Sequence, residues 1–174
     1  TKYLLWKWEK VMHINKLFWN IDVLSEDLKE ERYHLKKALE DAYKNDWKDG
    51  LLLSIHRHIT HIWKISEEIL EKVWRLKSNI ESSEYKEMFS FKTFHRWTKK
   101  QIEDPLSDIL KLLKKNRDIL TQGIQDIETQ IEKTQDPSHS WALSLQLKRL
   151  ELQKKEILQY IPLLEHSLEK LRDQ

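Results

Sequence analysis

The stretch "EDPLSDILKLLKKNRDILTQGIQDIETQIEKTQ" (103–135) decides the fold class of this chain. It opens with a helix-start signal, because Asp104 can cap the first turn and Pro105 suits the first helical position, where no backbone N–H is needed. Apolar residues then recur every three or four positions, which is the spacing of one face of an α-helix. They are Leu106, Ile109, Leu113, Leu120, Ile124, Ile127 and Ile131. The stretch predicts a long amphipathic helix whose apolar face is buried against other helices.

Three further stretches show the same spacing and predict long helices. They cover residues of about 3–46, 51–81 and 139–172, beside the helix at 105–135. Gly50 marks the first break, and "QDPSHS" (135–140) repeats the start signal with Asp before Pro. Pro162 inside the last stripe predicts a kink near 157–161. The aromatic-rich residues 85–103 do not indicate helix or coil clearly.

The composition agrees with an all-α protein. Its 174 residues include only two glycines and three prolines, which are too few turn residues for a protein of many short strands. Charged residues make up 34% of the chain in mixed order, as in long amphipathic helices. We therefore expect one domain over residues 1–174, an elongated antiparallel bundle or coiled coil of three to five long helices.

Several classes of function are disfavoured by what the chain lacks. A net charge of +2 is too small for a dedicated nucleic-acid binder. With Gly50 and Gly123 as the only glycines, a glycine-rich phosphate loop is excluded, and cysteine is absent. We expect no enzymatic activity, no cofactor and no small-molecule substrate. The chain has no run near eighteen apolar residues that would predict a transmembrane helix, and we expect a cytoplasmic location.

Three histidines, His56, His58 and His61, lie within six positions and raise the question of a metal site. On a helix only His58 and His61 could share a metal, and two imidazoles make half of a site. Glu31 and His34 form one Glu-x-x-His pair, whereas a di-iron bundle requires two. We therefore expect no metal. The histidines are either an ordinary helix surface or, below pH ~6.5, added positive charge that meets an anionic surface.

The N-terminal stretch "TKYLLWKWEKVMHINKLFWNI" (1–21) gives the best indication of function. The spacing places the main apolar stripe of this helix at 4, 8, 11, 14, 18, 21, 24, 28, 35, 39 and 42. Five more bulky residues fall outside that stripe: Leu5, Trp6, Met12, Leu17 and Trp19. A helix that is apolar on more than one side must bury more than one side. The partner is a second layer of the bundle, a dimer mate or a membrane interface.

Basic residues favour an anionic membrane as one such partner. The N-terminal stretch 1–21 carries Lys2, Lys7, Lys10 and Lys16, with Glu9 as its single acid. Later basic clusters comprise Lys92, Arg96, Lys99 and Lys100, then Lys111, Lys114, Lys115 and Arg117, and finally Lys148, Arg149, Lys154 and Lys155 around Glu151. Each cluster is either a solvated face or part of a surface for lipid head groups. The predicted membrane or partner surface comprises Lys2, Trp6, Lys7, Trp8, Lys10, Lys16, Trp19, Lys111, Lys114, Lys115, Lys148 and Arg149.

The order of the segments also carries a family resemblance. A long first helix, "INKLFWNIDVLSEDLKEERYHLKKALEDAYKND" (14–46), precedes "LLLSIHRHITHIWKISEEI" (51–69), then "DPLSDILKLLKKNRDILTQGIQDIETQIEKTQ" (104–135) and a Leu-rich last helix. This order resembles the BAR domains of the sorting-nexin type over nearly the whole chain. The resemblance implies a crescent-shaped dimer that scaffolds curved endosomal membrane, with residues 1–18 as a preceding amphipathic helix.

Two classes of function remain open on these grounds. One is a non-enzymatic scaffold that self-associates and binds anionic membrane, peripherally on the endosome. The other is a protein–protein interaction or purely structural bundle, a designed one included.

Overall fold

The computed structural model describes residues 2–44 and 50–172, and the side chains within them except at 41–43 and 50–55. Four long helices make up most of it: α1 (Lys2–Lys44), α2 (Gly50–Glu81), α4 (Asp104–Lys133) and α5 (Pro137–Arg172). The connection from α2 to α4 contains a 3-10 turn η1 (Glu84–Glu87), the short helix α3 (Phe91–Thr98) and a π turn η2 (Lys99–Glu103). No strand occurs in the described ranges, which confirms the all-α class.

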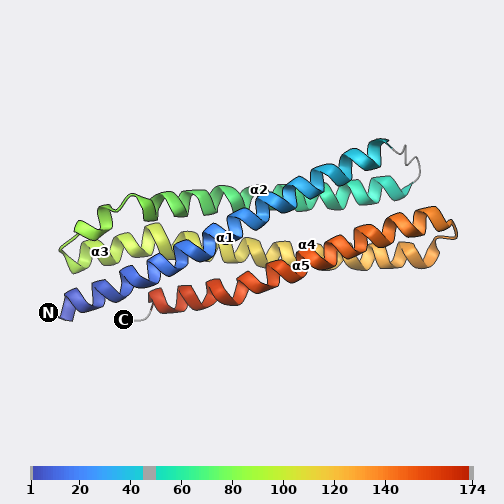
Figure 1. Cartoon of the computed structure of the whole chain (residues 1–174). Helices are drawn as coiled ribbons and strands as arrows, with labels where there is room; N and C mark the ends of the chain where they lie inside the picture. Colours follow the sequence, from blue (N-terminus) through green and yellow to red (C-terminus); the bar gives the residue numbers. More distant parts are fainter. Residues whose placement is uncertain (1, 45–49, 173–174) are drawn as a thin grey trace.

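The four long helices lie along one another, with the first residues of the chain and α3 at the same end of the molecule (Figure 1). α1 packs against α2 and α5, and α4 packs against the same two helices. Lys77 of α2 meets Asp22 of α1, and Glu67 of α2 meets Arg32 further along α1. α1 and α2 therefore run in opposite directions, and α1 and α4 lie at opposite corners of the arrangement.

The buried stripes of α2 and α4 follow the three–four spacing. In α2 they comprise Ile59, Ile62, Ile65, Ile69, Val73, Leu76 and Ile80. In α4 they comprise Leu106, Ile109, Leu110, Leu113, Leu120 and Ile127. Of the residues expected on α4, Ile124 and Ile131 are only half-buried, and Leu110 is buried in addition. Each helix has its charged residues on the other side, so that burying one face removes most of its large apolar side chains from water.

The junction between α3 and α4 differs from the expectation. Asp104 does not cap a new helix, because Glu103 and Asp104 already have helical backbone angles and the helix continues through η2. Pro105 has no backbone N–H, and the π turn beside it accommodates this loss. The carbonyl of Gln101, which an N–H at position 105 would otherwise reach, accepts a hydrogen bond from Nδ2 of Asn79 at 3.0 Å. The proline thus favours a contact between α2 and η2 rather than a helix start.

The start of α5 agrees with the expectation. Oδ1 of Asp136 accepts a hydrogen bond from the N–H of Ser138 at 2.9 Å, and Pro137 occupies the first helical position. α5 is helical on both sides of Pro162, which lies on the exposed side of the helix. The kink near this proline stays a prediction.

The predicted stripe of α1 is wrong in its first two turns. Leu4 and Trp8, expected in the core, are 55% and 65% exposed, whereas Leu17, expected outside the stripe, is fully buried. The core face begins instead with two lysines, Lys7 and Lys10. It continues through Ile14, Leu17, Ile21, Leu24, Leu28, Leu35 and Ala38. A stripe chosen by hydrophobicity alone excludes buried lysines, and so it was placed on the wrong side of this end of the helix.

Candidate interaction surface

The first half of α1 has a second apolar side that is exposed. Its residues, here called the α1 outer stripe, are Leu4, Leu5, Trp8, Met12, Trp19 and Val23. At ~100° per residue they lie within roughly 100° of one another and about opposite the buried Ile14 and Ile21. Trp19 alone is 71% exposed. α1 is therefore apolar on two opposed sides, and the core buries only one of them.

The prediction that Lys7 and Lys10 belong to the surface is wrong, because both are buried and their ammonium groups donate hydrogen bonds to carbonyls within the fold. Nζ of Lys7 donates to the carbonyls of Lys86 and Met88, both at 2.7 Å. Nζ of Lys10 donates to the carbonyl of Leu171 at 2.5 Å in the last turn of α5. Carbonyls at a helix C-terminus lack partners within the helix and favour a cation. The two lysines join the start of α1 to η1 and α5.

Trp6 is likewise a packing residue rather than a surface residue. Its ring centroid lies 4.9 Å from that of Phe91 and 5.6 Å from that of Phe94, both in α3. Phe94 is fully buried, so Trp6 holds α3 against the start of α1. Of the predicted N-terminal surface, Lys2, Trp8, Lys16 and Trp19 are exposed.

The predicted basic residues of α4 and α5 do not join these residues in one surface. Lys111, Lys114 and Lys115 are exposed on α4, at the corner opposite α1, and Nζ of Lys114 lies 3.5 Å from Oε1 of Glu165. Lys148 is exposed on α5. Beside it, the half-buried Arg149 donates from Nη1 to the carbonyl of His34 in α1 at 3.3 Å.

α5 carries an exposed apolar stripe that the sequence reasoning missed. Its residues, here called the α5 outer stripe, are Trp141, Leu145, Leu152 and Leu163. Their spacings of four, seven and eleven place them on one side of the helix, about opposite its buried residues. This spacing was present in the sequence, but the stronger Leu and Ile stripe of the core masked it.

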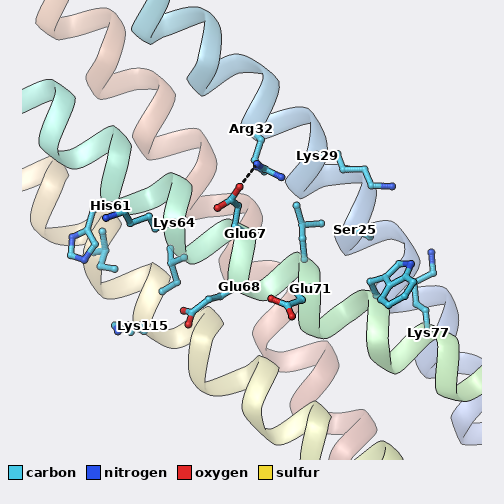
Figure 2. Close-up of a pocket in the computed structure, with 14 residues that line it drawn as sticks. Ser25, Lys29, Arg32, His61, Lys64, Glu67, Glu68, Glu71, Lys77 and Lys115 are labelled. Carbon is cyan, nitrogen blue, oxygen red and sulfur yellow. Dashed lines mark hydrogen bonds and ion pairs between the residues drawn. The ribbon is translucent and has the colours of Figure 1, made fainter.

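A groove of about 910 Å³ runs along α2, with residues of α1 such as Arg32 on one side and Lys115 and Ile119 of α4 on the other. Figure 2 shows Arg32 and Glu67 pointing toward one another across it, with Nη2 of Arg32 at 2.8 Å from Oε1 of Glu67. The Arg32 guanidinium also lies 4.4 Å from the ring centroid of Trp63. Nζ of Lys77 pairs with Oδ1 of Asp22 at 2.5 Å. These mutual ion pairs stabilise the contact between α1 and α2 and leave an open surface of mixed charge.

The three histidines of α2 do not converge. Nε2 of His58 lies 3.1 Å from Oδ2 of Asp126 in α4, His56 is half-buried, and His61 is exposed in the groove of Figure 2. His58 thus contacts α4 from the border of the buried stripe. Within residues 2–44 and 50–172 no three side chains of His, Asp or Glu are grouped as metal ligands.

A seam of acidic residues joins α1 to α5. Nε2 of Gln153 donates to Oε2 of Glu31 at 2.9 Å, and the hydroxyl of Tyr160 donates to Oδ2 of Asp27. Burial and the neighbouring Glu156 raise the pKa of Glu31 to about 9, so that it holds its proton at neutral pH. Burial and Asp27 also raise the pKa of Tyr160. The seam is a polar contact between the two helices that carry outer stripes.

Comparisons with known proteins give no family for this chain. No protein-family model, no curated protein and no solved structure matches it. Among the helices of the described ranges, none combines the length and the apolar character needed to cross a membrane.

Proposed function

We propose that this chain is a non-enzymatic scaffold, an elongated antiparallel helical bundle that self-associates through the α1 outer stripe. The observation that carries the proposal is the opposed pair of apolar sides on α1, of which one is exposed over five turns. A large apolar side chain left in water forgoes roughly 1.5–3 kcal/mol of burial free energy. Covering this stripe therefore supplies the driving force for association.

The size of the stripe suits a protein interface. Its two tryptophans, two leucines, methionine and valine present several hundred Å² of apolar surface. The largest apolar patch on a typical monomer is ~300–600 Å², and a standard interface buries ~800 Å² on each partner. The α5 outer stripe is a separate exposed apolar surface on the neighbouring helix, mostly level with the later part of α1, where Arg149 of α5 meets His34.

The arrangement of the stripe favours a second copy of the chain as partner. An antiparallel pair of α1 helices related by a twofold axis would set Leu4 against Val23 and Trp8 against Trp19. The exposed charges complement one another in the same pairing, because Lys2 precedes the stripe and Glu26 follows it. An isologous interface of this kind closes as a dimer.

A membrane partner on the same stripe is the second candidate, and the structure weakens its basis. Two of the four lysines on which it rested, Lys7 and Lys10, are buried. Lys2 and Lys16 remain exposed. The resemblance to BAR domains stays a prediction, and it too implies a dimer.

The test is the molecular mass in solution over a range of concentrations. We expect the native chain to form a dimer and the double variant Trp8→Lys with Trp19→Lys to be a monomer of unchanged helicity. Trp74→Lys is the matched control, because Trp74 is 69% exposed but lies on α2, outside the stripe. A native chain that is monomeric throughout, or a dimer that both kinds of variant weaken equally, would refute the proposal.

A further inference from the structure

A basic groove runs along α3 and η2 at the end of the molecule. It has a volume of about 310 Å³ and is lined by Met88, Lys92, Thr93, Arg96, Trp97, Lys100 and Gln101. The three basic residues are four positions apart, which aligns them along one side of the helix. We call this feature the α3 groove.

The basic residues of the α3 groove have no ion-pair partner among the residues that the structure describes. No acidic residue lines it. None of Lys92, Arg96 and Lys100 forms an ion pair with a residue of the described ranges, in contrast to Lys77 and Lys114. Three aligned cations without carboxylates repel one another, and an anion bound between them would relieve that repulsion.

The groove stands on rigid support. Trp97, one of its walls, stacks on the buried Tyr85 with ring centroids 4.5 Å apart. On the inner side of α3, Phe94 is fully buried and contacts Trp6 of α1. Because packing already fixes this backbone, binding a ligand costs little ordering of the groove.

An exposed phenylalanine, Phe89, directly follows Met88, one of the residues that line the groove. Phe89 is 84% exposed, the highest value among the large apolar residues of the described ranges. The residue before it is anchored, since the carbonyl of Met88 accepts hydrogen bonds from the Tyr3 hydroxyl at 2.9 Å and from Nζ of Lys7 at 2.7 Å. Nζ of Lys7 also lies 5.7 Å from the centroid of the Phe89 ring, so the start of α1 contacts this exposed side chain.

We propose that the α3 groove binds the phosphate head groups of an anionic membrane, with Phe89 inserted among the lipids beside them. Arg96 supplies a planar guanidinium that can bind two phosphate oxygens at once, and Lys92 and Lys100 add point charges. An aromatic side chain at the level of the head groups adds apolar burial that salt does not screen. The pairing of basic residues with an exposed aromatic residue favours a membrane over a soluble phosphate.

This inference goes beyond self-association and does not depend on it. The α3 groove and the α1 outer stripe have no residue in common. A chain that fails to dimerise can still bind vesicles, and the reverse also holds, so failure of one proposal is distinguishable from failure of the other.

The experiment is co-sedimentation of the whole chain with vesicles of phosphatidylcholine alone and of phosphatidylcholine mixed with phosphatidic acid. We expect binding to the acidic vesicles only, weakened by salt. Replacing Lys92, Arg96 and Lys100 together by Gln should reduce it by on the order of 100-fold, at roughly fivefold per charge. Phe89→Ser should reduce the part of binding that persists at high salt.

The matched control replaces Lys111, Lys115 and Lys148 by Gln, which removes the same charge from exposed sites elsewhere and should leave more than half of the binding. Circular dichroism checks that every variant is folded. A soluble arm measures the binding of inorganic pyrophosphate to the native chain and to the variant of Lys92, Arg96 and Lys100 by titration calorimetry. The proposal is overturned by absence of binding to acidic vesicles, by equal losses in the two triple variants, or by pyrophosphate binding in the groove without vesicle binding.

Discussion

α2 and α4 each have one apolar face, whereas α1 and α5 each have two. Among the described side chains, Trp74 is the only large apolar residue exposed on α2, and α4 exposes none. α1 and α5 lie side by side and carry both outer stripes. Packing within the chain therefore buries nearly all large apolar side chains of α2 and α4, and it leaves α1 and α5 with exposed apolar surface.

The largest expected effect on stability is the loss of a core side chain from α2 or α4. Ile62→Ala in α2 or Leu113→Ala in α4 should lower the free energy of unfolding by about 2–5 kcal/mol, because both residues are fully buried. Leu5→Ala in the α1 outer stripe should change it by less than ~0.5 kcal/mol in the monomer. Urea denaturation at low protein concentration measures both. Equal losses at Leu5 and Ile62 would mean that α1 has no free apolar side.

The buried lysines give the next effect. Lys10→Met should cost about 1.5–3 kcal/mol, because a charged donor to the last carbonyls of α5 is removed. Lys16→Met, on the exposed side of the same helix, is the control and should lie within ~0.5 kcal/mol of the native chain. Thermal and urea unfolding of the two variants measure these changes in the free energy of unfolding. If Lys10→Met were as stable as the native chain, Lys10 would belong to the surface after all.

The acid seam predicts a pH dependence of stability. The pKa of Glu31 in the folded chain, about 9, is above its ordinary value, so the folded state holds the proton more tightly than the unfolded state does. The stabilisation is complete below pH ~4.3 and is lost as the pH rises toward 9. As the pH rises between these two values, the free energy of unfolding of the native chain should fall. The fall should be larger than that of Glu31→Gln by on the order of 1–3 kcal/mol. Parallel slopes in urea titrations over this range would contradict the assignment.

The smallest effect concerns a buried polar side chain of α4, a helix of the pair with one apolar face. Asn116 is fully buried there, and neither its Oδ1 nor its Nδ2 has a hydrogen-bond partner in the described ranges. Asn116→Leu should raise the free energy of unfolding by about 1–2 kcal/mol, since the buried amide is not compensated. The midpoint of urea unfolding reports this change. A loss of stability would indicate that a polar group or a bound water contacts the amide.

The two pairs also differ in how far the sequence predicts them. The stripes of α2 and α4 were predicted because burial there follows hydrophobicity at helical spacing, as at Ile62 and Leu113. The inner side of α1 was predicted from Ile14 onward but not in its first turns. There Lys10 is buried against the carbonyl of Leu171, 161 positions away, and no local pattern encodes that contact. Hydrophobicity scales count such a lysine as exposed whatever its partners are.

The exposed apolar side of α1 was predicted in part. Of the bulky residues expected outside the stripe, Leu5, Met12 and Trp19 are exposed, whereas Leu17 is buried. Trp6 was misassigned because Phe91 and Phe94, more than eighty positions later, cover it. The α3 groove could not be delimited, because its walls come from two turns and a helix whose packing the aromatic-rich stretch does not reveal.

The most direct test of the opposed apolar sides uses the absence of cysteine from the chain. An antiparallel pair of α1 helices places Asn15 near the twofold axis and Leu4 far from it, while a parallel pair would bring every position close to its own copy. We predict that Asn15→Cys gives a disulfide-linked dimer under mild oxidation, and that Leu4→Cys and Trp74→Cys do not. Equal cross-linking at Asn15 and Leu4 would contradict the antiparallel pairing. No cross-linking at either position would contradict self-association through the α1 outer stripe.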